Sequence, residues 1–110
     1  MAKNQFHIET YTMPLGVDSW QTENIMKASD DQEQVYNRWQ AIVKEIGRDY
    51  PQARIRRTLA RRTVEQAFSD RESAIASREW KLPNGEGNYR VTMYVTKAAC
   101  LWTSLRTSAR

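Results

Sequence analysis

The feature that most limits the fold of this chain is a pair of alternating runs between residues 73 and 97. In the second run, apolar residues occupy every other position from 89 to 95. Successive side chains of a strand point to opposite faces, so a period of two is typical of a strand. The segment between the runs contains Asn84-Gly85, a strong signal for a tight turn. The pattern therefore predicts an antiparallel β-hairpin over 73–97.

A single amphipathic helix is predicted over residues 30–46. Ser29 stands at the N-cap position, and Gln32 follows at the spacing of a capping box. Gly47 is a suitable residue just beyond the C-terminal end. Apolar side chains recur every three or four positions, which places them on one stripe of the helix. The stripe consists of Val35, Trp39, Ile42, Val43 and Ile46.

The remaining segments are less regular. Residues 4–13 alternate as a strand, and 17–27 form a poorer second strand before the helix. For 52–70 two interpretations stay open: a strand near 52–58 followed by a helix near 59–69, or one continuous strand. A short helix is predicted at 98–105.

These elements predict one α+β domain over residues 1–110. We expect an antiparallel sheet of about three to five strands, with the 30–46 helix packed on one face and a second short helix near 59–69. A chain of 110 residues is long enough for one such core and too short for two. The other face of the sheet is expected to be polar unless a partner covers it.

All of the excess charge lies in one short window. Residues 48–62 contain six arginines and one acid, Asp49, whereas the whole chain carries only +4. Such a local positive field favours an acidic or phosphate-rich partner. On a regular strand, Arg54 and Arg56 would point one way and Arg57 the other. The alternative is a solvated face paired with nearby acids.

Catalytic and metal-binding patterns are weak. His7 is the single histidine, and it shares a strand face with Glu9, which allows a weak hypothesis of acid–base catalysis. Cys100 is the single cysteine, and its apolar neighbours favour a buried structural thiol. One Cys and one His cannot make the common zinc sets. No phosphate-binding loop is present, so we expect no cofactor and no metal.

The location and class of the protein are also expectations. The first residues contain no apolar run of the kind found in signal peptides. No stretch approaches the length needed to span a bilayer, so no membrane contact is expected. With a lone cysteine, no intrachain disulfide can form. We therefore expect a cytoplasmic protein.

We expect this chain to act by binding another macromolecule rather than by catalysis. The first hypothesis is a regulatory, inhibitor or assembly protein that binds a protein partner. The alternative is a nucleic-acid-binding protein that uses the arginines of 48–62. Arginine, tryptophan and tyrosine are enriched in binding hot spots. The candidate binding residues are Arg54, Arg56, Arg57, Arg61, Arg62, Trp80 and Tyr94.

Overall fold

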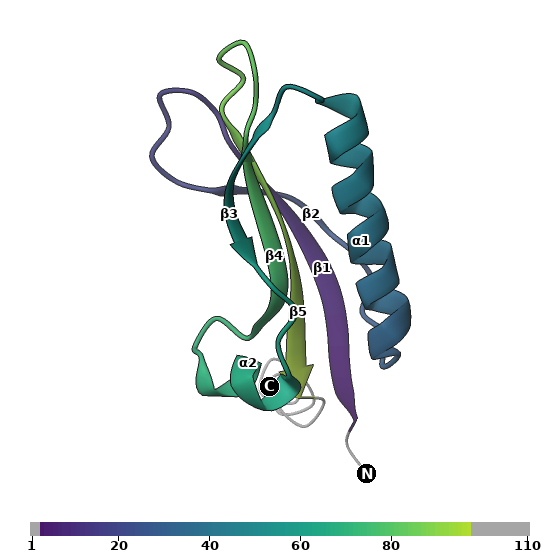
Figure 1. The fold of residues 1–110 in the computed structure, drawn as a ribbon. Helices are drawn as coiled ribbons and strands as arrows, with labels where there is room; N and C mark the ends of the chain where they lie inside the picture. Colours follow the sequence, from purple (N-terminus) through teal and green to yellow (C-terminus); the bar gives the residue numbers. More distant parts are fainter. Residues whose placement is uncertain (1–2, 98–110) are drawn as a thin grey trace.

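The protein is an α+β fold built on a five-stranded antiparallel sheet (Figure 1). The computed structural model describes residues 3–97. Along the chain the elements are β1 (Asn4–Met13), β2 (Gln21–Ile25), α1 (Gln32–Asp49), β3 (Arg54–Leu59), α2 (Val64–Ser69), β4 (Ala74–Lys81) and β5 (Asn88–Lys97). The strand order β2-β1-β5-β4-β3 places β2 and β3 at the two edges. The predicted fold class, with one main helix and a short second helix, is confirmed.

The predicted hairpin is formed by β4 and β5. Asn84 and Gly85 adopt φ angles of 61° and 71°, a left-handed region that these two residue types tolerate better than others. Alternation along β5 then turns Val91 and Met93 toward α1, and Arg90 and its alternate neighbours to the opposite face. The hairpin therefore sets the two chemically different faces of the sheet.

Helix α1 is displaced slightly from its predicted ends. Asp31 is the N-cap and accepts a hydrogen bond from the Gln34 backbone N–H at 3.1 Å, so the predicted Ser29 cap is wrong. Ser29 instead forms an isolated bridge with Phe6 of β1. Gly47 lies inside the helix, which continues to Asp49. The helix ends there because Pro51 disfavours helical geometry in the residue before it.

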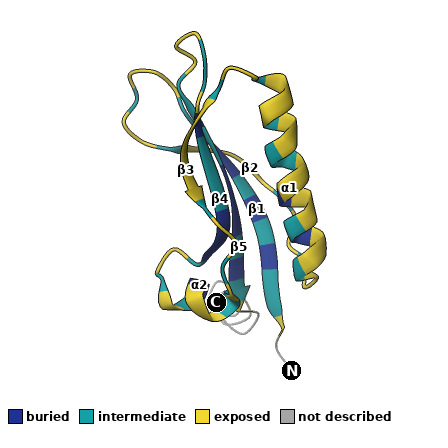
Figure 2. Ribbon diagram, viewed as in Figure 1, coloured by how far each residue is buried: buried dark blue, intermediate teal, exposed yellow. Residues whose placement is uncertain are grey.

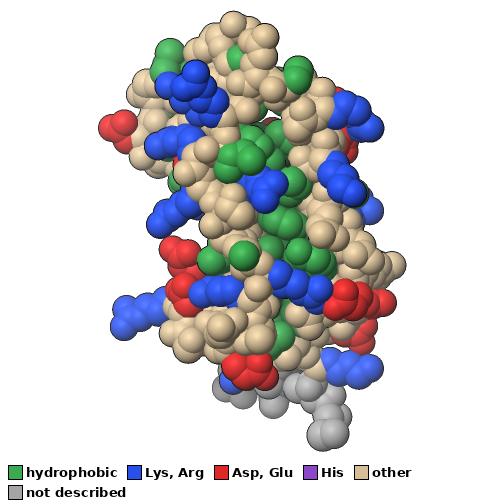
Figure 3. All heavy atoms as spheres, viewed as in Figure 1, with side chains coloured by type: hydrophobic (Ala, Val, Ile, Leu, Met, Phe, Trp, Pro, Cys, Tyr) green, Lys and Arg blue, Asp and Glu red, His purple; other side chains and the backbone are tan. Residues whose placement is uncertain are grey.

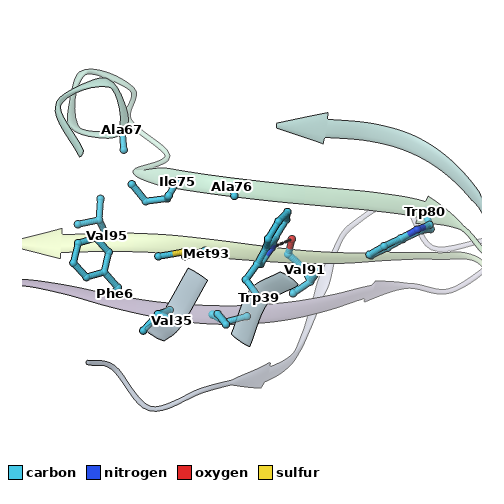
Figure 4. Packing of buried hydrophobic residues seen from close by; sticks show 11 residues of the cluster. Phe6, Val35, Trp39, Ala67, Ile75, Ala76, Trp80, Val91, Met93 and Val95 are labelled. Atoms are coloured by element: carbon cyan, nitrogen blue, oxygen red, sulfur yellow. Dashed lines mark hydrogen bonds between the residues drawn. The ribbon is translucent and has the colours of Figure 1, made fainter. Parts of the chain in front are cut away.

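The core lies between α1 and the central strands. Trp39 packs into its centre, and its indole N–H donates to the Val91 carbonyl oxygen at 3.2 Å (Figure 4). The apolar stripe predicted for the helix is confirmed, because its members are all buried or packed against the core. The buried side chains of the core cluster are Phe6, Ile8, Val35, Trp39, Ala67, Ile75, Ala76, Trp80, Val91, Met93 and Val95.

Residues 52–70 adopt the mixed interpretation, a strand followed by a short helix. Thr63 begins α2 with a capping box in which it exchanges hydrogen bonds with Gln66. Ala67 is fully buried and attaches this helix to the end of the sheet. The predicted helix at 98–105, which includes Cys100, lies outside the described residues.

Helix α1 covers only part of its side of the sheet. It lies over β1 and β5, while β3 stands apart from it at the edge (Figure 1). The outer surface of α1 is exposed, and the buried residues concentrate in the central strands (Figure 2). Within residues 3–97, no helix is long and apolar enough to cross a membrane.

Candidate partner-binding edge

Strand β3 is the most exposed part of the arginine-rich window. It forms one edge of the sheet and, among the described residues, pairs only with β4. Five of its six residues are exposed, and only Leu59 is half-buried (Figure 2). The backbone groups along its outer side therefore have no strand beside them in the described part of the chain.

A bulge in β3 changes where its arginines point. Ile55 lies opposite Trp80, and Arg57 lies opposite Glu79, so the intervening Arg56 has no partner of its own. One extra residue reverses the alternation beyond it. The prediction that Arg57 points away from the face shared by Arg54 and Arg56 is therefore wrong. The cause is the irregular register, which strict alternation cannot anticipate.

The three arginines of β3 gather on the face of the sheet away from α1. Arg57 lies opposite Glu79, whose side chain is only 13% exposed, and Arg56 Nη1 lies 3.5 Å from a carboxylate oxygen of Glu79. Arg54 lies opposite Lys81, which adds a further positive charge. One glutamate therefore faces several cations. We call Arg54, Arg56 and Arg57 the arginine edge.

The other face of β3 carries one apolar residue, Ile55, and one polar residue, Thr58. Ile55 is 57% exposed and lies beside Trp80, which is 3% exposed. Hydrophobic side chains gather in a strip between α1 and the β3–β4 side of the sheet, with Lys and Arg side chains both at its borders and within it (Figure 3). Arg78 also lies on this face, opposite Thr58, and its buried Nε has no hydrogen-bond partner. Strand β3 thus has three arginines on one face and, on the other, an exposed apolar side chain, Ile55, with Arg78 of β4 nearby.

Arg61 is engaged by helix α1. Its guanidinium donates to both carboxylate oxygens of Glu33, with Nη1 at 3.3 Å from Oε2, and lies 4.2 Å from the centre of the Tyr36 ring. The hydrogen bonds from Arg61 lower the pKa of the Glu33 carboxyl. Arg61 therefore joins the segment before α2 to the start of α1 and is not part of the arginine edge.

Arg62 is engaged by the chain around α2. Its Nε and Nη2 donate to the Ala74 carbonyl oxygen at 2.9 and 2.6 Å, and Nη1 lies 3.1 Å from Asp70 Oδ2. The Arg62 side chain is only 19% exposed. The Glu72 backbone N–H, and after it Arg62, lower the pKa of the Asp70 carboxyl. These contacts give Arg62 a structural role.

The two candidate aromatic residues, Trp80 and Tyr94, lie on opposite faces of the sheet. Trp80 lies in the core on the α1 side, where it packs against Tyr89 with ring centres 6.3 Å apart. It offers almost no surface to a partner, because its strand position faces the interior. Tyr94 lies on the opposite face and is half-buried. Tyr94 is therefore the aromatic member of the predicted set that shares a face with the arginine edge.

Tyr94 belongs to a polar network around His7. Its hydroxyl lies 2.7 Å from the Tyr11 hydroxyl, and its ring stacks on His7 with centres 5.4 Å apart. His7 Nε2 lies 2.7 Å from Glu9 Oε2, and the Tyr11 hydroxyl donates to Glu9 Oε1 at 2.8 Å. Burial, and then the hydrogen bonds with Tyr94 and Glu9, raise the pKa of Tyr11 well above its usual value. Both oxygens of Glu9 are thereby occupied.

Arg90 makes contacts with two aromatic rings that the sequence did not indicate. Its guanidinium lies 4.3 Å from the Tyr11 ring centre and 4.9 Å from that of Trp20. Trp20 lies in the connection between β1 and β2, so this contact holds that connection against the sheet. A sequence signal for it is lacking, because Arg90 and Tyr11 are neighbours only through the β1–β5 register.

No site in the described structure has the ligands of a metal centre. Within residues 3–97, no group of three or more His, Cys, Asp or Glu side chains is placed to hold a metal ion. The chemical features that remain available to a partner are the arginine edge, the adjacent apolar strip and the polar face around Tyr94. No family model, curated protein or solved structure matches this chain.

Proposed function

We propose that this chain is a non-enzymatic protein-binding module that takes an acidic partner at the arginine edge. The observation that carries the proposal is the gathering of Arg54, Arg56 and Arg57 on one face of an exposed edge strand. Among the ion pairs of residues 3–97, these arginines form one, between Arg56 and Glu79. Arginine forms bidentate contacts with carboxylates, so an acidic partner gains several charge-assisted hydrogen bonds at this edge.

A protein partner fits this edge better than a nucleic acid. A nucleic acid would need a longer row of arginines to contact successive phosphates. Arg61 and Arg62 do not extend the arginine edge in this way, because they are paired with Glu33 and Asp70. The apolar Ile55 is exposed beside the arginine edge, and the apolar strip continues toward α1 (Figure 3). An apolar surface next to a charged one is typical of a protein interface, in which an apolar centre is bordered by polar contacts.

The proposal is tested by covalent capture inside the source cells. Ile55 is replaced by a photo-crosslinking amino acid, and the captured adduct is treated with nuclease and its tryptic peptides are identified by mass spectrometry. We expect an adduct that nuclease leaves intact and that yields peptides of a second protein. A matched control carries the crosslinker at Arg38, an exposed position on α1 beside Lys27.

Charge reversal provides the second half of this test. Introducing Arg54→Glu and Arg57→Glu into the crosslinking variant should remove the adduct, while the circular dichroism spectrum stays that of the parent. An adduct that nuclease removes would favour the nucleic-acid alternative. An adduct that persists after charge reversal would show that the arginine edge is not the binding site.

A further inference from the structure

We infer that the partner binds as an added sixth strand along β3, and that its sequence alternates acidic and apolar residues. This inference rests on the proposed function and specifies how the same edge recognises its partner. Addition of an extended segment to an exposed sheet edge is a recurring mode of peptide recognition, in which backbone hydrogen bonds supply affinity and alternate side chains supply specificity.

The backbone of β3 supplies the first part of the site. Its inner side pairs with β4, and no described element covers its outer side. An extended segment placed there would satisfy the free N–H and C=O groups by extending the antiparallel or parallel ladder. The six residues of β3 match the usual strand length of about five or six residues.

Side chains on the two faces of β3 determine the composition of the added strand. On the face away from α1, it would meet Arg54, Arg56 and Arg57, where acidic residues are favoured because opposite charges on neighbouring strands attract. On the α1 side, it would lie beside Ile55 and Thr58, where apolar side chains of the segment can pack on Ile55 and extend the apolar strip. Since strand side chains alternate between faces, the segment must alternate acidic and apolar residues.

The same geometry disfavours a second copy of β3 as the occupant. Pairing β3 with itself would bring the arginine edges of two molecules together on one face, and like charges on facing strands are destabilising. A different segment, of opposite charge, is therefore the occupant we infer.

The inference is tested with labelled synthetic peptides of about six residues, the length of an ordinary strand. The probe alternates glutamate and valine and has blocked ends. One control has the same composition, with the glutamates in one block and the valines in another. Two further controls carry N-methyl groups on the odd or on the even residues, which removes the hydrogen-bond donors along one side of the peptide. Binding is measured by fluorescence anisotropy at near-physiological salt.

We expect the alternating peptide to bind at least about tenfold more tightly than the block peptide, a difference of roughly 1.4 kcal/mol. One of the two N-methylated peptides should lose binding, and the other should bind like the parent. Arg57→Glu should weaken the parent peptide about tenfold, whereas Arg38→Glu should have little effect. Amide exchange along β3 should slow when the peptide is bound.

Other outcomes would overturn strand addition. If the block peptide binds as well as the alternating one, or if both N-methylated peptides bind like the parent, the backbone of β3 is not the recognition element. If Arg57→Glu still weakens binding in that case, the acidic-partner proposal stands and only its mode is wrong. If no peptide binds, strand addition is also wrong, and the crosslinking result at Ile55 decides the proposed function independently.

Discussion

Trp39 joins helix α1 to the middle of the sheet through both its ring and its indole N–H. Trp39 is 6% exposed, and its indole N–H donates to the Val91 carbonyl oxygen on the central strand β5. Burial of so large an aromatic group contributes more to stability than most single core residues. Its hydrogen bond also fixes the rotation of the helix over the sheet.

Replacement of Trp39 by phenylalanine should destabilise the fold by about 1–3 kcal/mol, because it removes a buried hydrogen-bond donor and leaves part of the ring volume empty. The quantity to measure is the free energy of unfolding in urea. Gln40→Ala, at the exposed neighbouring position, serves as the control and should change it by less than about 0.5 kcal/mol. Equal stability of the Phe variant and the parent would show that Trp39 does not anchor α1.

The free energy of unfolding should depend on pH through the Asp70 carboxyl. Its folded-state pKa is lowered, chiefly by the Glu72 backbone N–H and then by Arg62, so folding favours the ionised carboxylate. This contribution is present above the unfolded pKa of about 3.9 and is lost as the pH falls through the lowered folded value. Asp70→Asn should therefore be less stable than the parent at pH 7, and the difference should shrink in acid.

Unfolding free energies of the parent and Asp70→Asn, measured in urea between neutral and strongly acidic pH, test this dependence. Glu65→Gln, an exposed site in the first turn of α2, is a control for loss of one nearby carboxylate. A difference between the parent and Asp70→Asn that stays constant across the pH range would contradict the linkage.

At the scale of elements, the turn between β4 and β5 depends on a close approach to the end of β1. Gly87 has a φ of 94°, a region that side-chain-bearing residues rarely adopt. A Cβ at this position would clash with the Met13 carbonyl oxygen and lie 2.9 Å from Pro14 Cα. The hairpin therefore packs against the β1–β2 connection only because Gly87 lacks a side chain.

Two glycine substitutions should have opposite effects on stability. Gly87→Ala should destabilise by at least about 1–3 kcal/mol through backbone strain and steric overlap. Gly47→Ala should stabilise by roughly 0.5–1 kcal/mol, since Gly47 lies within α1 with open space around it and alanine favours the helix. Thermal unfolding of the two variants compares them directly. A stable Gly87→Ala protein would mean that the hairpin tip can move away from β1.

At the scale of the whole molecule, the central strands of the sheet are buried and its two edge strands are exposed to solvent. Strands β1, β5 and β4 carry most of the buried core, whereas β2 and β3 are almost entirely exposed (Figure 2). The arginine edge lies on one of these exposed strands, β3. The other exposed strand, β2, contains Glu23 and no basic residue, so the two edges of the sheet differ in charge.

Amide hydrogen exchange should reproduce this order. Exchange should be slowest in β1, β5 and β4, whose opening requires global unfolding, and fastest in β2 and on the outer side of β3. Exchange measured residue by residue in the isolated protein tests the pattern. Protection of all β3 amides without a partner would show that something already covers this edge, and it would contradict an open binding strand.

Local patterns in the sequence predicted the elements. The period-two runs of 4–13 and 73–97 became β1 and the β4–β5 hairpin, and the Asn84-Gly85 dipeptide became its turn. The apolar stripe around Trp39 correctly indicated the buried face of α1. These features are predictable because side-chain periodicity and turn chemistry act between residues close in sequence. The helix ends were less predictable, since Ser29 and Asp31 are both acceptable caps.

The sequence by itself therefore determined the fold class, the first strand, the hairpin, the main helix and its buried face, and the presence of a dense arginine window, while it left residues 52–70 open. Only the tertiary structure decided which arginines are available to bind a partner. Arg61 and Arg62 found partners in Glu33 and Asp70, and a bulge at Arg56 brought the arginines of β3 onto one face. Strand register, bulges and ion pairs depend on tertiary contacts between segments that are distant in sequence, and no local sequence pattern specifies those contacts.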